Sequence, residues 1–202
     1  MKPILFVDFN GVQSYLPFWS SLLDPSHQLH SRLADIEELI FRRDPQLVRE
    51  WMLGEYTSED IHELIERELG IPKSELFPIF EQDCRNIDIH PEIQTALRTL
   101  KSRYYLILAT GNMDSFDRFT IPAHPELEET FDEIHNSYNI GIHKPDQNGK
   151  YFTDVMTKQG VEPSICHLID DSGSSCAAFR QAGGVAHQTK IPEEVLAVIA
   201  SL

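Results

Sequence analysis

The acidic residues with the clearest chemical potential in this sequence are Asp8 and the adjacent pair Asp170 and Asp171. They follow short apolar runs, residues 4–7 and 168–169, that are typical of buried strands. In open α/β sheets, ligands bind at the carboxyl ends of the strands. Adjacent carboxylates repel each other and lose solvation there, so the pair indicates a nearby cation, and oxygen ligands suit Mg²⁺. Asp8 alone fits a solvated loop or an Asx-turn equally well.

Two further segments offer groups that bind anions. Thr110, Gly111 and Asn112 follow another apolar run, and a hydroxyl with free backbone N–H groups at a helix start forms an anion site. The alternative for this segment is a plain helix N-cap. Lys144 precedes Pro145, which holds the lysine extended and lets its ammonium reach into a cleft. Taken alone, a Lys-Pro pair is more typical of a surface loop.

The elements that must position these groups fall into two parts of the sequence, one with alternating strands and helices and one with helices alone. Strands are predicted at residues 4–7, 104–109, 131–137, 165–169 and 185–187, and helices at 91–101, 112–119, 149–160, 174–182 and 192–202. This alternation predicts an α/β fold with a doubly wound, Rossmann-like parallel sheet. Residues 14–86 instead carry only helical patterns, at 31–40, from 45, at 57–70 and from 72. We therefore expect a core domain of residues 1–13 and 87–202, with an all-helical cap domain, 14–86, inserted after the first strand.

Composition excludes several classes of function. The net charge of −15 argues against a nucleic-acid partner, and it requires any anionic substrate to be attracted locally. No apolar run approaches the ~20 residues of a membrane-spanning helix, so no membrane partner is expected. Cys84, Cys166 and Cys176 show no CxxC spacing and are expected to be buried free thiols. Because the first residues lead straight into a strand rather than a secretory signal, a cytoplasmic setting is expected.

Four segments together resemble the haloacid dehalogenase-like (HAD) superfamily of hydrolases. Residues 7–12, 110–112, 144–145 and 170–172 match its four motifs in order, each at a predicted strand end or in the loop that follows. The position of the helical insertion resembles the subgroup that contains haloacid dehalogenases, phosphoglycolate phosphatases and the phosphatase domain of soluble epoxide hydrolases. The resemblance extends over nearly the whole chain.

The resemblance implies a role for each of these residues. Asp8 would attack phosphorus to form an aspartyl-phosphate, with Mg²⁺ as cofactor between Asp8, the backbone carbonyl of Asn10 and Asp171. Asp170 would support the metal, and the cap would exclude water and select the leaving group. The substrate, a small phosphorylated metabolite, would be held by the following residues: Gly11, Thr110, Gly111, Asn112 and Lys144.

Asn10 departs from the pattern of the family's phosphatases. They usually carry a second Asp at this position, which protonates the leaving group and then activates the hydrolytic water. A carboxamide cannot exchange a proton at neutral pH, and such general acid–base help is worth ~100- to 10,000-fold in rate. His27, His30, His143 and the cap residues are candidates to supply it, by their closeness to the motifs in the sequence alone. The alternative for these histidines is that they are solvated surface residues, as most such histidines are.

Three functions are compatible with these residues. A Mg²⁺-dependent phosphatase, slowed by Asn10, ranks first because Asp8, Thr110, Lys144 and the Asp pair are all present. A non-catalytic or regulatory binding protein is the alternative, and a metal-independent 2-haloacid dehalogenase ranks last because it gains nothing from paired aspartates. Within the cap, Tyr15, Phe18, Trp19 and Trp51 either line a pocket or form its core, and Arg42 with Arg43 either meets the substrate or forms a solvated helix end.

Overall fold

The structure, a computed structural model, describes residues 2–202 and confirms the predicted α/β class. A five-stranded parallel sheet has the order β3-β2-β1-β4-β5. Its strands are β1 (Ile4–Val7), β2 (Tyr105–Thr110), β3 (Glu133–Asn136), β4 (His167–Asp170) and β5 (Val185–Gln188). The strand order reverses between β1 and β4, and this is the point where α/β sheets bind ligands at their carboxyl ends.

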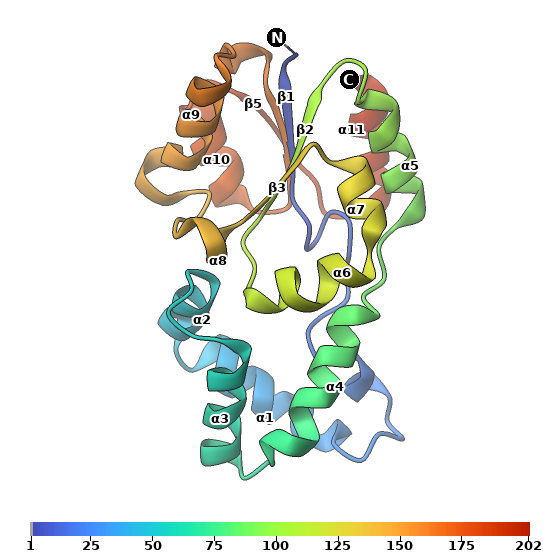
Figure 1. Ribbon diagram of the computed structural model, residues 1–202, viewed down its shortest axis with the longest axis vertical. Coiled ribbons are helices and arrows are strands. Elements are labelled where there is room, and N and C mark those ends of the chain that lie inside the picture. Colours follow the sequence, from blue (N-terminus) through green and yellow to red (C-terminus); the bar gives the residue numbers. More distant parts are fainter. Residues whose placement is uncertain (1) are drawn as a thin grey trace.

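Helices cover both faces of the sheet because its strands alternate apolar side chains between the faces. On one face Leu5, Val7 and Leu106 pack against α5 (Pro91–Leu100), α7 (Pro125–Thr130) and α11 (Pro192–Ser201). On the other face Phe6 and Leu168 pack against α9 (Asp146–Gln159) and α10 (Gly173–Gln181). Figure 1 shows the sheet with its covering helices in the upper half of the molecule and the amino terminus at its top.

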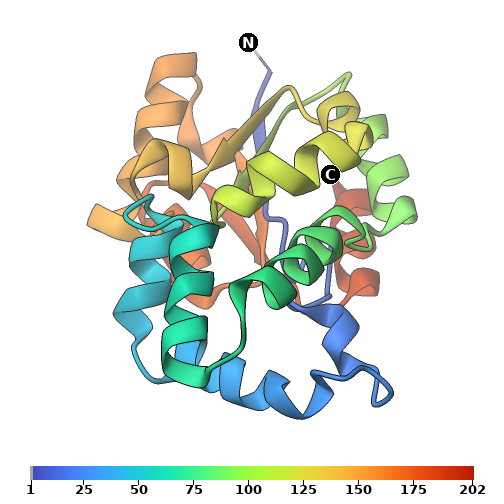
Figure 2. The same ribbon diagram turned by 60° about the horizontal axis from the view of Figure 1, so that its bottom comes forward.

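The segment between β1 and α5 is helical throughout its regular elements, as its sequence pattern predicts. It contains α1 (Leu33–Glu37), α2 (Pro45–Met52), α3 (Ser58–Leu69) and α4 (Lys73–Arg85), the 3-10 helices η1 (Ser20–Leu23) and η2 (His30–Arg32), and the π-helix η3 (Glu38–Arg42). Its apolar core is a cluster around Trp19, Trp51 and Phe80. Figure 1 shows these helices below the carboxyl ends of the strands, and Figure 2 brings them in front of the sheet.

Element boundaries follow the predictions, with four differences. The helix predicted at 112–119 begins only at Asp114 and continues as the π-helix η4 (Phe116–Thr120) and α6 (Ile121–Ala123), because Asn112 uses its own side chain to accept from the N–H of Met113. The helix predicted at 31–40 is divided among η2, α1 and η3. The assigned helix α9 starts three residues before the predicted position 149, but residues 147–149 have positive φ, so its regular part starts only after them. Three short helices escaped prediction: α7, α8 (Ser137–Ile140) and η5 (Pro163–Ile165).

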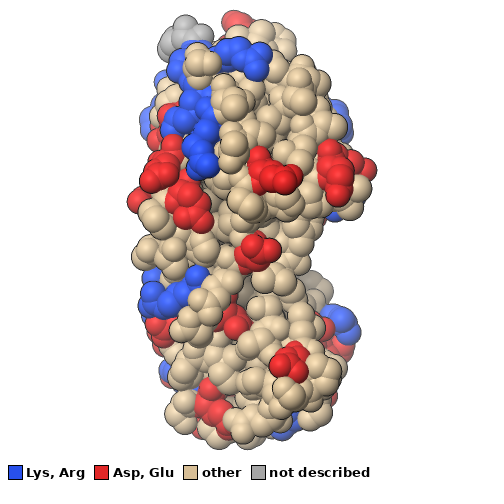
Figure 3. Space-filling model, turned by 90° about the vertical axis from the view of Figure 1, so that its right-hand side faces the viewer, with Lys and Arg blue, Asp and Glu red and all other residues tan. Residues whose placement is uncertain are grey.

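The three cysteines are all buried and free, as predicted. Among residues 2–202, no helix combines the length and apolar character that crossing a bilayer requires. Figure 3 shows acidic side chains spread over both parts of one face, while basic side chains gather mainly toward its upper end.

Candidate active site

The predicted acidic residues meet where β1 and β4 end side by side. Asp8 follows β1, Asp170 ends β4, and Asp171 comes next. One carboxylate oxygen from each of the three lies within 4.8 Å of the others. Sequence spacing could not show this closeness directly, but parallel pairing of the two strands produces it.

Backbone contacts hold Asp8 in place. Its N–H donates to the carbonyl of Ile169 at 2.9 Å, and its own carbonyl accepts from the Gln13 side chain at 2.7 Å. Carboxylate Oδ1 accepts from the Phe9 N–H at 2.8 Å, which leaves Oδ2 directed toward the cluster. Burial raises the pKa of Asp8 to about 7, with the charge of Asp170 adding to the rise and that of Lys144 opposing it.

Lys144 lies between the acids. Its Nζ is 2.8 Å from Asp8 Oδ2, 2.6 Å from Asp170 Oδ2 and 3.0 Å from the carbonyl of Ala109, so three acceptors take up its three protons. Burial alone would lower the pKa of Lys144, but the Asp8 and Asp170 carboxylates outweigh it and raise that pKa above its ordinary value. Lys144 therefore stays charged and places a fixed ammonium beside Asp8.

Asp171 completes the acidic cluster from the other side. Its carboxyl lies against the turn at Gly11, where a Cβ would come within 2.7 Å of Asp171 Cγ and Oδ2. Gly11 also has φ of +74°, a conformation that favours glycine. Burial, followed by the charge of Asp170, raises the pKa of Asp171. Only a residue without a side chain at position 11 allows this carboxylate to approach the turn after β1.

These donors fit a hard divalent cation. Three carboxylates cluster here, and Lys144 pairs with two of them. Burial, with the charge of Asp170 adding to it, raises the pKa values of Asp8 and Asp171. Mg²⁺ prefers oxygen ligands and binds through one or two carboxylates. The glycine turn at position 11 allows the Asp171 carboxylate to lie within this cluster of oxygen ligands.

The loop after β2 contributes differently from what the sequence suggests. The Thr110 hydroxyl is buried and has no hydrogen-bond partner within residues 2–202, so it is available to a bound group. Asn112, predicted to bind substrate through its amide, already donates its backbone N–H to Asn136 Oδ1 at 3.2 Å. The Asn112 side chain instead donates to Asn10 Oδ1 at 2.9 Å. Asn112 thus holds Asn10 and contacts β3, a pair of contacts that local sequence cannot reveal, while its part in substrate binding stays a prediction.

A cleft of about 370 Å³ opens beside Asp8. Lys144 and Gly111 line it from the core, and one face of α2 lines it from the helical segment. The lining residues of α2 are Pro45, Arg49 and Met52, and three serines complete the wall: Ser172, Ser174 and Ser175. Sequence analysis missed Arg49, although it shares a helical face with Pro45 and Met52. Its guanidinium pairs with Asp146 at 2.6 Å, which ties α2 to the start of α9.

The three candidate histidines differ in whether they line the cleft. His143 lines the cleft, next to Lys144. His27 Nδ1 accepts from the Leu29 N–H, and His30 Nδ1 bonds the carbonyl of Leu22, and neither lines the cleft.

None of the remaining candidates in the helical segment lines the cleft beside Asp8. Trp19 and Trp51 are fully buried in its core, Phe18 packs against that core, and Tyr15 is exposed. Arg42 and Arg43 pair on the surface with Glu37 and Glu68, so the interpretation as a solvated helix end fits them.

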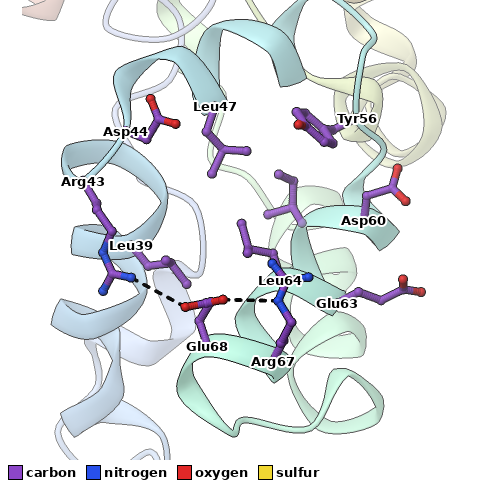
Figure 4. Close-up of a pocket in the computed structure, with 11 residues that line it drawn as sticks. Leu39, Arg43, Asp44, Leu47, Tyr56, Asp60, Glu63, Leu64, Arg67 and Glu68 are labelled. Atoms are coloured by element: carbon purple, nitrogen blue, oxygen red, sulfur yellow. Dashed lines mark hydrogen bonds and ion pairs between the residues drawn. The ribbon is translucent and has the colours of Figure 1, made fainter.

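A second cavity, of about 500 Å³, lies within the helical segment. Figure 4 shows its apolar floor of Leu39, Leu47 and Leu64, with Glu68 between Arg43 and Arg67 at the rim. None of the predicted motif residues lines it. Its ion pairs are exposed, and exposed pairs contribute little stability.

Comparisons with known proteins identify the family of this chain and structures with a similar fold. A family model described as haloacid dehalogenase-like hydrolase matches residues 23–183. A predicted HAD-like hydrolase from Porphyromonas gingivalis is 19% identical, with a TM-score of 0.75 over 100% of this chain and 97% of that one. A HAD family enzyme from Bacteroides thetaiotaomicron, in complex with magnesium and inorganic phosphate, is 18% identical, with a TM-score of 0.69 over 94% and 95%.

A similar fold occurs in a dehalogenase. The L-2-haloacid dehalogenase from Xanthobacter autotrophicus, with chloropropionic acid covalently bound, is 14% identical, with a TM-score of 0.64 over 98% of this chain and 88% of that one. At these identities the solved structures establish the fold alone. The family model spans most of the sequence. The chain therefore belongs to the haloacid dehalogenase-like hydrolase family.

Proposed function

We propose that this protein is a Mg²⁺-dependent phosphatase that hydrolyses a small phosphorylated metabolite through an aspartyl-phosphate on Asp8. The observation that carries the proposal is the cluster of Asp8, Asp170 and Asp171, in which Lys144 pairs with the first two and lines a cleft together with Asp8. A halide-releasing site has no use for three carboxylates, because its leaving group needs no cation to offset phosphoryl charge. The magnesium–phosphate complex of the Bacteroides thetaiotaomicron relative supports the same chemistry.

Each step then rests on residues of this chain. Asp8 Oδ2 attacks phosphorus while the ester oxygen leaves, which forms the acyl phosphate, and water later releases phosphate and restores the carboxylate. Lys144 offsets the negative charge of nucleophile and phosphoryl group, and the partnerless Thr110 hydroxyl donates to a phosphoryl oxygen. Asp8, the Asn10 carbonyl and Asp171 would hold Mg²⁺, with Asp170 supporting them, and the ion supplies further charge neutralisation. Residues 14–86 act as the cap, with α2 as its face over the cleft.

The test is phosphate release from a panel that includes p-nitrophenyl phosphate and acetyl phosphate, with and without Mg²⁺. Wild-type protein should turn over one or more esters only with Mg²⁺, and Asp8→Asn should abolish turnover. Asp35→Asn, an exposed aspartate of α1, serves as the matched control and should keep full activity. No turnover on the panel would refute the proposal. Binding of Mg²⁺ and phosphate without turnover would then favour a binding protein, and metal-free chloride release from 2-chloropropionate a dehalogenase.

A further inference from the structure

The proposed reaction lacks a proton donor at the usual place, and the structure shows why Asn10 does not provide one. Its side-chain oxygen accepts from Asn112 Nδ2 at 2.9 Å. A carboxamide in this arrangement neither gives nor takes a proton at neutral pH. An ester with a poor leaving group therefore requires another acid in the cleft.

His143 occupies the wall of that cleft together with Asp8 and Lys144. Its ring lies over the loop after β2, with Nδ1 3.8 Å from where a Cβ on Gly111 would be. The neighbouring Thr110 provides the free hydroxyl expected to hold the phosphoryl group. His143 thus stands at the boundary between the phosphoryl site and the helical roof formed by α2.

One ring nitrogen of His143 is engaged and the other is free. Nε2 is 3.4 Å from the carbonyl of Arg49, and a carbonyl only accepts, so Nε2 carries the hydrogen of this contact. No group within residues 2–202 bonds Nδ1. The contact with α2 therefore orients the ring and leaves Nδ1 available for proton exchange in the cleft.

The charged groups around His143 determine how readily its ring gains and loses a proton. Arg49 faces it from α2, Asp146 accepts from its backbone N–H, Lys144 is its chain neighbour, and Asp8 lies across the cleft. Burial, followed by the Arg49 cation, lowers the pKa of His143. A ring that is neutral at pH 7 can take a proton from water, and its protonated form is a competent acid.

We infer that His143 is the general acid and base of the reaction, in place of the carboxylate that position 10 lacks. This inference rests on the proposed phosphatase function. In the first step, the protonated ring gives its Nδ1 proton to the ester oxygen as the P–O bond breaks and Asp8 bonds to phosphorus. In the second, neutral Nδ1 takes a proton from water as the water oxygen attacks phosphorus and the Asp8–phosphorus bond breaks. The cycle ends with alcohol and phosphate released and the imidazolium restored.

The first test compares leaving groups. An alkyl phosphate such as glycerol phosphate needs protonation of its leaving oxygen, whereas p-nitrophenyl phosphate needs little. His143→Gln should lower kcat/KM about 100-fold or more for the alkyl ester and much less for the aryl ester. His30→Gln, from the helical segment, is the control and should change neither. Equal losses on both esters, or no loss, would overturn the role of His143.

The second test is rescue. Asn10→Asp restores the carboxylate that the family's phosphatases use, and that carboxylate can still accept from Asn112. In the His143→Gln background, Asn10→Asp should recover at least 10-fold of the alkyl phosphatase activity. A purely structural loss at His143 would not be recovered in this way, so absence of rescue contradicts the inference.

The third measurement needs no variant. In wild-type protein, kcat/KM for the alkyl ester should fall with rising pH relative to the aryl ester, because only the alkyl ester needs the imidazolium. Titration of Asp8 affects both esters alike and cancels in this ratio. A ratio that does not change with pH would overturn the inference even where the variants fail to fold. A wild-type protein without any phosphatase activity would overturn the proposed function, and this inference with it.

Discussion

At the scale of single residues, the site consists of charges that the fold forces together. Asp8, Asp170 and Asp171 lie within a few ångströms, with Lys144 as the ammonium that pairs with two of them. Such a group is unfavourable without a further cation, because burial and mutual repulsion disfavour the ionised carboxylates. Burial first, and then the charge of Asp170, raise the pKa of Asp8 to about 7.

Gly11 offers a test of how close Asp171 must lie. Gly11→Ala should destabilise the protein by about 1–2 kcal/mol for positive φ, with a further loss because its Cβ meets Asp171. Gly70→Ala is the matched control, since φ is +66° there but no atom lies within 4 Å. Urea unfolding should show the larger loss for Gly11→Ala, and calorimetry should show weakened Mg²⁺ binding for that variant alone. Equal losses in both variants would mean that Asp171 can move away freely.

Sequence reasoning located the residues that end strands but not those that depend on distant contacts. Asp8, Asp170 and Lys144 follow patterns readable along the chain, and the sheet brings them together. Arg49 lines the cleft because α2 lies over it, and Asn112 bonds both Asn136 of β3 and Asn10. These placements need the relative positions of elements far apart in sequence, which periodicity does not contain.

At the scale of elements, one buried carboxylate joins the helical segment to the loop after β2. Asp114 Oδ1 accepts from Trp51 Nε1 at 3.0 Å and from Ser58 Oγ at 2.7 Å. Its Oδ2 accepts from the Ser58 N–H at 3.1 Å and pairs with Arg118 at 2.6 Å. Because Ser58 begins α3, the negative charge also lies at the positive end of the helix dipole. This contact fixes the helical segment against the helical stretch that follows β2.

Asp114→Ala should therefore cost about 3–5 kcal/mol, since it leaves buried donors and part of a cation without partners. Glu59→Gln removes the more exposed partner of the same Arg118 and should cost less than about 1 kcal/mol. Chemical unfolding of both variants measures the difference. A small loss for Asp114→Ala would show that α3 and α2 are held mainly by apolar contacts with Met113 and Phe119.

The prediction of elements succeeded where apolar runs were long enough to give a clear pattern. Strands β1, β2 and β4 and helices α3, α5 and α10 start within two residues of where apolar runs and helical patterns place them. The short helices α7 and α8 were missed, because a turn or two of helix offers too few residues for a 3.6-residue period. The π-helical pattern of η4 likewise has no signature in periodicity.

At the scale of the whole molecule, the core of the helical segment contains a buried histidine that links stability to pH. His62 Nε2 accepts from Trp19 Nε1 at 3.3 Å, and its Nδ1 donates to the carbonyl of Ser58 at 2.7 Å. Burial lowers the pKa of His62 to about 4. The neutral ring is thus part of the packed core formed with Trp19 and Phe80.

The sign of this linkage follows from proton binding. Between pH 6.5 and about 4 the unfolded chain binds a proton at His62 and the folded protein does not, so stability falls as pH falls. The full effect is about 3 kcal/mol. His62→Gln should remove it, so the stability difference between wild type and variant should shrink as pH falls from 7 to 4.

Stability must be compared between wild type and His62→Gln, because the titration of Asp8 changes stability in the opposite direction over an overlapping pH range. Its raised pKa makes the folded protein bind a proton between about pH 7 and 3.8, which adds stability as pH falls. Thermal unfolding of both proteins at a series of pH values provides the data. A difference that stays constant with pH would show that His62 can be protonated in place.

Trapping the intermediate would show whether Asp8 carries the phosphoryl group during turnover. Wild-type protein is mixed with ³²P-labelled acetyl phosphate and Mg²⁺, quenched in acid and digested, and the label is located by mass spectrometry. The account predicts an acid-stable, base-labile phosphate on the peptide containing Asp8, absent in Asp8→Asn and absent when Mg²⁺ is chelated. Label on another residue, or turnover with no label at Asp8 under rapid quenching, would contradict it.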